Sequence, residues 1–289
     1  MRSTLALSLL LAALSLAPSA RADDAKPAEA KAAPAKAAAP KTTAATELTW
    51  YGNAAFKIVT PKGHILFVDP WLQNPLNKTG KEDLAGITKG DLILITHGHF
   101  DHVGDAAAIA KATGAKLVTT FDLGNALVAH GGIPKEQFGF DTTGYFGGEI
   151  SLLDGDVKVA FIPAVHAADL TGTDGVTYPG GAAGGFVISI ANGPRIYHTG
   201  DTDFFSDMAL VKKFGAVDVM LACIGDRFTM GPKRAALAVN AVQPKQVIPM
   251  HFATFPVLTG SVPDFAKELK AAGSKAKLHE LKIGETVKL

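Results

Sequence analysis

The side chains best suited to chemistry lie in one short segment, residues 96–102, which reads Thr-His-Gly-His-Phe-Asp-His. It contains four potential metal ligands, His97, His99, Asp101 and His102. In an extended or turning segment His97 and His99 point the same way, because alternate residues share a face. The side chains of Asp101 and His102, at the start of the next predicted helix, can then face a second point beside the one that His97 and His99 face. Packing alone does not explain such a cluster at a strand end, so the spacing predicts two adjacent metal ions.

Three further candidate ligands each stand just past a predicted strand. They are His166, Asp201 in the turn His-Thr-Gly-Asp-Thr, and His251. Taken singly, each of these residues would more often be structural, but together with the segment at 96–102 they extend the candidate site. Imidazole and carboxylate ligands without thiolates suit zinc best, and they can also bind manganese or iron.

The composition narrows the classes of function. The chain has 289 residues, 47% of them hydrophobic, and 28 Lys+Arg balance 27 Asp+Glu. Such a chain can bury a large core, which excludes a disordered or collagen-like protein. The formal net charge of +1 provides no strong field for phosphate backbones, so we expect no nucleic-acid partner. The single cysteine, Cys223, excludes a cysteine-rich metal site and suits a small buried hydrophobe. A small-molecule substrate is therefore the expected partner, and the oligomeric state stays open.

The first 46 residues have the pattern of a targeting segment followed by a tether. Residues 1–22 combine a basic start, an apolar run and an A-x-A motif, which is typical of a cleaved signal peptide. An uncleaved membrane anchor is the alternative, although the uncharged run barely reaches spanning length. Residues 23–46 are rich in Ala, Lys and Pro and are expected to form a disordered linker. We therefore predict a periplasmic or secreted protein with no membrane span after cleavage.

The remaining residues, 47–289, have the length of one domain. Early strands are spaced as hairpins and later strands alternate with helices, so we predict an α/β (α+β) fold with two stacked sheets covered by helices. Strands are predicted at 48–51, 56–60, 64–68, 91–96, 116–120, 157–162, 185–190, 217–221 and 246–249, and helices at 106–113, 206–214, 232–242 and 263–272.

The order of the candidate ligands resembles that of the metallo-β-lactamase superfamily over the whole of 47–289. The resemblance depends on His-x-His-x-Asp-His at 97–102, the later His166, the Gly-Asp-Thr at 200–202 and the final strand-end His251. It implies a four-layer αββα sandwich with the metal ions at one edge of the two sheets.

Three longer strings narrow the resemblance. They begin at Tyr197 (Tyr-His-Thr-Gly-Asp-Thr), Ile224 (Ile-Gly-Asp-Arg-Phe-Thr-Met-Gly-Pro) and Pro244 (Pro-Lys-Gln-Val-Ile-Pro-Met-His-Phe-Ala-Thr-Phe-Pro). They look like the subfamily of metal-dependent hydrolases related to ascorbate-phosphate lactonases and N-acyl-phosphatidylethanolamine phospholipase D.

The same resemblance implies how the ligands divide between two divalent metal ions. His97, His99 and His166 would hold the first ion, Asp101, His102 and His251 the second, and Asp201 would bridge both. Asp101 is the candidate proton shuttle, because a carboxylate ligated through one oxygen leaves the other free, and a purely ligating role is the alternative. True metallo-β-lactamases lack a carboxylate bridge at the place of Asp201, which argues against β-lactam hydrolysis.

Other positions are expected to support the site. Relatives usually carry His where this chain has Asn53, which can donate a hydrogen bond but cannot titrate near neutrality. Asp69 and Asp105 are candidates to accept the second N–H of a ligating histidine. The glycine-rich loop at 171–185 is expected to border the site, and Arg227 either binds an anionic group or is solvated.

Together these features predict a binuclear metal-dependent hydrolase that attacks ester-like bonds, either lactone or phosphodiester, with a metal-bridging hydroxide. A β-lactam or thioester hydrolase with the same site is one alternative. The other is a non-catalytic metal- or ligand-binding envelope protein.

Overall fold

The computed structural model describes residues 44–289. The predicted signal peptide at 1–22 and nearly all of the predicted linker at 23–46 lie outside the described residues, so both segments and the periplasmic location remain predictions. None of the described helices has the length and apolar character needed to cross a membrane.

The first sheet has seven strands in the order β16-β1-β2-β3-β4-β5-β6. Its strands β1, β2, β3 and β16 pair antiparallel, whereas β3, β4, β5 and β6 run parallel. The strand bounds are β1 Glu47–Trp50, β2 Phe56–Val59, β3 Ile65–Val68, β4 Leu92–Leu94, β5 Lys116–Thr120, β6 Thr143–Gly144 and β16 Thr286–Lys288.

The second sheet also has seven strands, in the order β15-β14-β13-β12-β11-β8-β7. A separate two-stranded hairpin pairs β9 (Leu170–Thr171) with β10 (Thr177–Tyr178). The bounds in the second sheet are β7 Glu149–Leu152, β8 Val157–Pro163, β11 Gly184–Ile190, β12 Arg195–His198, β13 Val219–Cys223, β14 Gln246–Met250 and β15 Lys277–Leu278.

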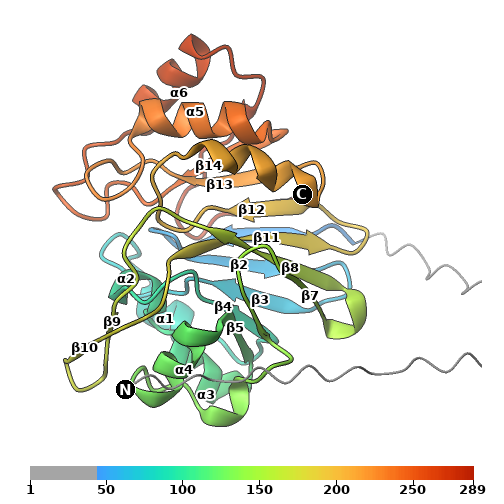
Figure 1. Ribbon diagram of the computed structural model, residues 1–289, viewed down its shortest axis with the longest axis vertical. Coiled ribbons are helices and arrows are strands. Elements are labelled where there is room, and N and C mark those ends of the chain that lie inside the picture. The colour runs from blue at the N-terminus through green and yellow to red at the C-terminus, as the bar shows by residue number, and fades with distance from the viewer. Residues whose placement is uncertain (1–43) are drawn as a thin grey trace, which may run out of the picture. The chain divides into compact units, whose positions relative to one another are not determined.

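Helices cover the outer face of each sheet, as the ribbon in Figure 1 shows. One buried cluster fills the space between the sheets and continues under α5 and α6, and a second lies between the first sheet and helices α3 and α4. This arrangement confirms the predicted four-layer αββα sandwich. The helices are α1 Gly80–Ala85, α2 Phe100–Val103, α3 Ala106–Thr113, α4 Phe121–Ala129, α5 Pro232–Val242 and α6 Val262–Ala271, with 3-10 helices η1 Lys135–Gln137, η2 Leu153–Gly155 and η3 Ser206–Phe214.

The local sequence explains why several of these elements form and where they begin. Strand β4 is apolar throughout because both of its faces are buried: Leu92 and Leu94 join the cluster between the sheets, and Ile93 joins the cluster under the helices. Helix α5 begins with Pro232. Proline has no backbone N–H, and the N–H groups in the first turn of a helix have no partner within the helix, so proline is well suited to this position. At the start of α6, the Ser261 hydroxyl accepts a hydrogen bond from the Asp264 amide.

Several short elements were not predicted, among them α1, β7 and β16, and two further differences concern helical segments. The sequence pattern did not indicate α4, which contains Gly124, a poor helix former. A Cβ at this position would lie 2.0 Å from the Phe138 ring, so tertiary packing requires the glycine. The segment predicted as a helix at 206–214 forms the 3-10 helix η3.

The topology brings the candidate ligands to one edge of both sheets. Strands β12, β13 and β14 run parallel, and β8 has the same direction because it and β12 are both antiparallel to β11. In the first sheet β3 and β4 run parallel. The loops that follow these strands therefore meet at the carboxyl ends of the strands, where ligand sites of open sheets commonly lie.

Candidate metal centre

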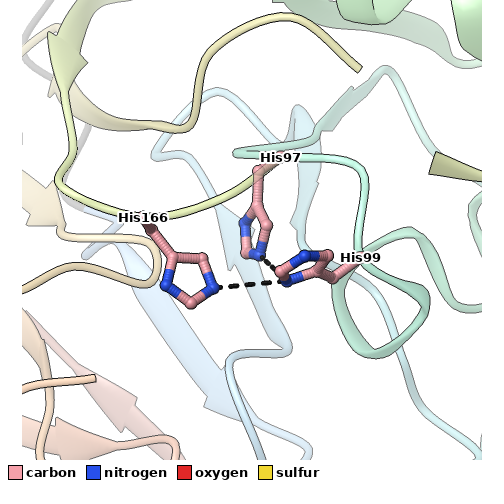
Figure 2. Close-up of side chains that lie close together, drawn as sticks. All are labelled: His97, His99 and His166. Atoms are coloured by element: carbon pink, nitrogen blue, oxygen red, sulfur yellow. Dashed lines mark hydrogen bonds between the residues drawn. The ribbon is translucent and has the colours of Figure 1, made fainter. Parts of the chain in front are cut away.

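Three histidines form the first part of the site. His97 Nε2 lies 3.0 Å from His99 Nδ1, and His166 Nε2 lies 3.2 Å from the same His99 nitrogen. Figure 2 shows the three rings directed toward one another, two from the loop after β4 and one from the loop after β8. With one nitrogen from each ring, this set could hold a metal ion.

Asp101, His102 and His251 form a second set that could hold a metal ion. His251 Nε2 lies 3.3 Å from Asp101 Oδ2, and all three residues are buried. Asp101 and His102 are consecutive in the short helix α2, whereas His251 comes directly after β14.

Asp201 lies between the two sets. Its Oδ2 atom is 3.1 Å from His251 Nε2, 3.3 Å from His102 Nε2 and 3.7 Å from His166 Nε2. One carboxylate oxygen therefore contacts ligand atoms on both sides of the site. All seven residues singled out from the sequence lie together here.

The electrostatic balance differs between the two sets. Burial and the neighbouring His102 hold the pKa of His97 well below its usual value, and burial also lowers the pKa of His99 and His166. Burial alone would lower the pKa of His251, but Asp201 and Asp101 raise it to about 9. The first set thus presents neutral imidazoles, as metal ligation requires, whereas the carboxylates beside the second set raise the pKa of both His102 and His251, so these two rings must release a proton to bind a cation.

Buried polar atoms without a hydrogen-bond partner show whether these residues are suited to bind a cation. His102 Nε2 and Asp201 Oδ1 are buried without a hydrogen-bond partner. Such atoms are costly inside a protein unless another group satisfies them. A divalent cation accepts electron pairs from imidazole nitrogen and carboxylate oxygen, so the donor set fits the predicted metal ions.

Asp69, at the end of β3, fixes the orientation of His102. Its Oδ2 atom lies 2.7 Å from His102 Nδ1, and its carboxylate also accepts hydrogen bonds from the amide and hydroxyl of Thr96. The contact predicted for Asp69 is confirmed. The one predicted for Asp105 is wrong, because that carboxylate accepts hydrogen bonds from the backbone and side chain of Gln73 instead.

The loop after β4 needs a glycine between its first two histidines. A Cβ at Gly98 would lie 2.7 Å from the Ala168 carbonyl oxygen, in the loop that carries His166. The absence of a side chain lets these two loops approach closely. The glycine in His-Gly-His thus allows the two loops to pack closely, and the spacing of two residues lets both imidazoles point to the same side.

Asn53 connects Asp101 to the neighbouring loops. Its side-chain nitrogen donates to the Asp101 carbonyl at 3.1 Å and to Asp101 Oδ2 at 3.3 Å, and its side-chain oxygen accepts a hydrogen bond from Thr254 Oγ1. Asn53 is completely buried, and its φ of 46° is tolerated by asparagine. The amide therefore positions the Asp101 carboxylate, a contact that sequence reasoning did not specify.

Replacing Asn53 with glycine should lower kcat about ten-fold while leaving the metal content unchanged, because Asp101 loses its positioning donor. Glycine accepts the left-handed backbone, so the variant removes the side chain without strain. Steady-state kinetics and elemental analysis measure both quantities. Asn192→Gly is the matched control, since Asn192 is exposed and has a φ of 58°. An Asn53→Gly protein with parental kcat would contradict the positioning role.

A cavity of about 550 Å³ opens over the site and is called the site cavity below. Side chains from both halves of the candidate centre face it, and apolar side chains form the rest of its lining. The lining consists of His99, Phe100, Asp101, His166, Asp201, Phe228, His251, Phe255, Pro256 and Val257.

One expectation about this lining is wrong. Within the described residues, the loop at 171–185 contributes nothing to the site cavity, because Gly180 packs on Ala168 and Gly181 on Asp122 of α4. Arg227 is exposed to solvent, which agrees with the solvated alternative; it lies outside the lining and places its guanidinium over the Phe228 ring. Sequence reasoning missed the apolar side chains, although several stand beside ligands, as Phe100 does between His99 and Asp101.

Other histidines and the cysteine have structural contacts. His198 Nε2 lies 3.0 Å from the Ala54 carbonyl oxygen, and its Nδ1 accepts a hydrogen bond from the Gly200 amide, beside the Gly-Asp-Thr turn as expected. His64 pairs with the buried Asp156. Cys223 is fully buried, as predicted.

Comparison with known proteins places the chain in a family. Residues 64–252 match the family model described as the beta-lactamase superfamily domain. A UPF0173 metal-dependent hydrolase from Thermodesulfovibrio yellowstonii is 57% identical over 248 residues, covering 85% of this chain and 92% of the relative. One from Anaeromyxobacter dehalogenans is 55% identical over 245 residues, covering 84% and 86%.

A solved structure is similar as well. Igni18, a metallo hydrolase from the hyperthermophilic archaeon Ignicoccus hospitalis, is 33% identical with a TM-score of 0.73, covering 85% of this chain and 99% of Igni18. The superfamily expected from the ligand pattern is confirmed, and the narrower subfamily resemblance stays a prediction. The chain therefore belongs to the beta-lactamase superfamily, in the family of the UPF0173 metal-dependent hydrolases.

Proposed function

We propose that this protein is a metal-dependent hydrolase that binds two divalent cations and cleaves ester-like bonds. His97, His99 and His166 hold one cation, Asp101, His102 and His251 hold the other, and Asp201 is shared. One observation carries the proposal: Asp201, which lines the site cavity, has its Oδ2 atom within 3.7 Å of imidazole nitrogens from both sets. The hydrolase names of the close relatives support the reaction class.

The ligands divide into a supporting layer and a reacting layer. His97 and His102 are completely buried and lie behind the lining, whereas His99, His166 and Asp101 face the site cavity. Asp69 holds the ring of His102, and Asn53 holds the carboxylate of Asp101. These contacts keep the ligands in place before any substrate enters, which lowers the reorganisation needed during the reaction.

Asp101 is the proposed proton carrier. Its carboxylate is buried apart from a small surface facing the site cavity, so it is within reach of a substrate. Asp101 accepts the proton that an attacking water loses and returns it to the oxygen of the leaving group. Divalent cations supply a strong nucleophile at neutral pH and stabilise the negative charge that develops on the attacked group, and zinc suits these ligands best.

Metal analysis combined with a hydrolysis screen tests this function. Elemental analysis of protein produced in zinc- or manganese-supplemented medium should give close to two metal ions per chain. Carboxylic esters, lactones, phosphodiesters, thioesters and β-lactams form the screen, and chelation should abolish any hydrolysis until metal is restored. His279→Ala is the control, because His279 lies outside the candidate sets.

Three results would contradict the proposal. A stoichiometry of one metal per chain, unchanged by added zinc or manganese, would remove the second site. Full metal loading without hydrolysis of any compound in the screen would favour a non-catalytic binding protein. Hydrolysis confined to β-lactams or thioesters would replace the proposed ester-like substrates with those alternatives.

A further inference from the structure

Apart from the candidate ligands, the site cavity is lined by apolar side chains. These residues, called the apolar wall, come from the start of α2 and from the loops after β13 and β14. Three separate segments of the chain thus place apolar surface beside the same polar centre. The apolar wall consists of Phe100, Phe228, Phe255, Pro256 and Val257.

Much of the apolar wall is exposed to solvent. The exposed fraction is 61% for Phe100, 55% for Phe228 and 42% for Val257. Leaving such side chains in water gives up the free energy that burial would contribute to folding. Exposed apolar surface next to a few convergent polar groups is typical of a ligand site.

Aromatic packing holds part of the apolar wall in a set position. The Trp71 ring packs edge-on against Phe100 at 5.6 Å and stacks with Phe255 at 6.0 Å between ring centroids. Phe100 and Phe255 also pack against each other at 6.2 Å. The three rings therefore form a preformed surface that loses little conformational entropy when a ligand binds.

The apolar wall offers no partner for a charged group on a substrate. Its side chains contain no hydrogen-bond donor, and no lysine or arginine of the described chain belongs to the lining. Arg227 lies with its guanidinium 5.6 Å from the centre of the Phe228 ring, outside the lining. An ionised group placed against this surface would lose hydration without compensation.

We infer that the substrates are neutral carboxylic esters or lactones that carry an aliphatic chain or an aromatic ring. The inference deepens the proposed function and rests on it. The apolar part of the substrate contacts the apolar wall, and its carbonyl faces His99, Asp101 and His166. Water adds its hydroxyl to the acyl carbon, the acyl carbon–oxygen bond breaks, and the departing oxygen takes the proton, giving an acid and an alcohol.

A series of p-nitrophenyl esters with the metal-loaded full chain tests the inference. From acetate through butyrate to octanoate, kcat/KM should rise about two- to four-fold for each methylene that the cavity buries. Bis(p-nitrophenyl) phosphate provides the charged comparison and should react at least ten-fold more slowly than the octanoate ester. The acetate ester reports the chemistry with almost no contact to the apolar wall.

Two variants connect the preference to the apolar wall. Phe228→Ala and Val257→Ala should each reduce the ratio of octanoate to acetate kcat/KM several-fold, because each removes apolar contact area. Phe140→Ala is the matched control: Phe140 is 86% exposed and stacks on Phe121, outside the lining of the site cavity. This control should leave the ratio unchanged.

Calorimetry gives a readout that does not depend on turnover. Methyl hexyl ketone and methyl ethyl ketone are neutral and resist hydrolysis, so both can be titrated into metal-loaded and chelated protein. The longer ketone should bind at least ten-fold more tightly, with a negative heat-capacity change, and Phe228→Ala should reduce this difference.

The outcomes separate the inference from the proposed function. Equal kcat/KM for acetate and octanoate, or a preference for the phosphodiester, would overturn the inference and leave the hydrolase function in place. Full metal loading with no hydrolysis of any ester or phosphodiester, but tighter binding of the longer ketone, would overturn the hydrolase function. Equal binding of the two ketones would also overturn the role of the apolar wall.

Discussion

Asp201→Ala should abolish turnover while the protein remains folded. We expect kcat to fall by a factor on the order of 10³ or more, because the two proposed cations would lose the group that they share. Bound metal should fall from about two ions to about one per chain. Elemental analysis, circular dichroism and kinetics on the best substrate of the screen measure these three properties.

Asp201→Asn should be nearly as damaging as Asp201→Ala. The amide keeps the shape of the side chain, but it removes the negative charge that attracts two dications, and its nitrogen has no lone pair for ligation. Asp203→Asn is the matched control, since Asp203 is a nearby acidic residue that pairs with Arg234 at the surface. Retention of both metal ions and of near-parental kcat in Asp201→Ala would contradict the shared role of Asp201.

The second large effect is expected from Asp69→Asn. Asp69 is completely buried and serves both His102 and Thr96, so removal of its charge weakens the hold on the His102 ring. Affinity for the second cation should fall about 10- to 100-fold, with a parallel loss of activity. Asparagine tolerates the φ of 44° at this position, so the change reports the carboxylate and not backbone strain.

Competition with a chromogenic chelator measures the affinity change in Asp69→Asn, and thermal unfolding measures stability. Asp105→Asn is the control, because its carboxylate binds Gln73 and touches none of the candidate ligands. We expect this control to keep both metal ions and its activity. If Asp69→Asn bound the second cation with parental affinity, Asp69 would have only a packing role.

The sequence alone identified the chemical groups of the site and much of its scaffold. His97, His99, Asp101 and His102 lie in the loop after β4 and in the helix α2 that follows it, so short-range spacing already placed them near one another. Helices α3 and α5 were predicted with the bounds that the structure has, because the period of their apolar residues is a local property. The order of the ligands also led to the correct superfamily.

The tertiary structure decided which distant groups meet. Strand β16 pairs with β1 from the opposite end of the domain, and Asn53 reaches Asp101 across two loops. Asp201 faces both ligand sets only because parallel strands end at one edge of the stacked sheets. Such contacts depend on strand order and loop paths, and the period of a sequence pattern contains no information about either.

The apolar wall, which we infer to select the substrate, also could not be predicted from the sequence pattern. Phe228 and Phe255 come from loops after β13 and β14, and neither loop has a period that marks it as part of a cavity. Their rings face the same space as Phe100 because the two sheets stack through their shared core. Residue types and local spacing therefore determined the reaction chemistry that this chain can perform. The surface available to a substrate was decided by the packing of segments far apart in the sequence, since only the folded chain brings them together.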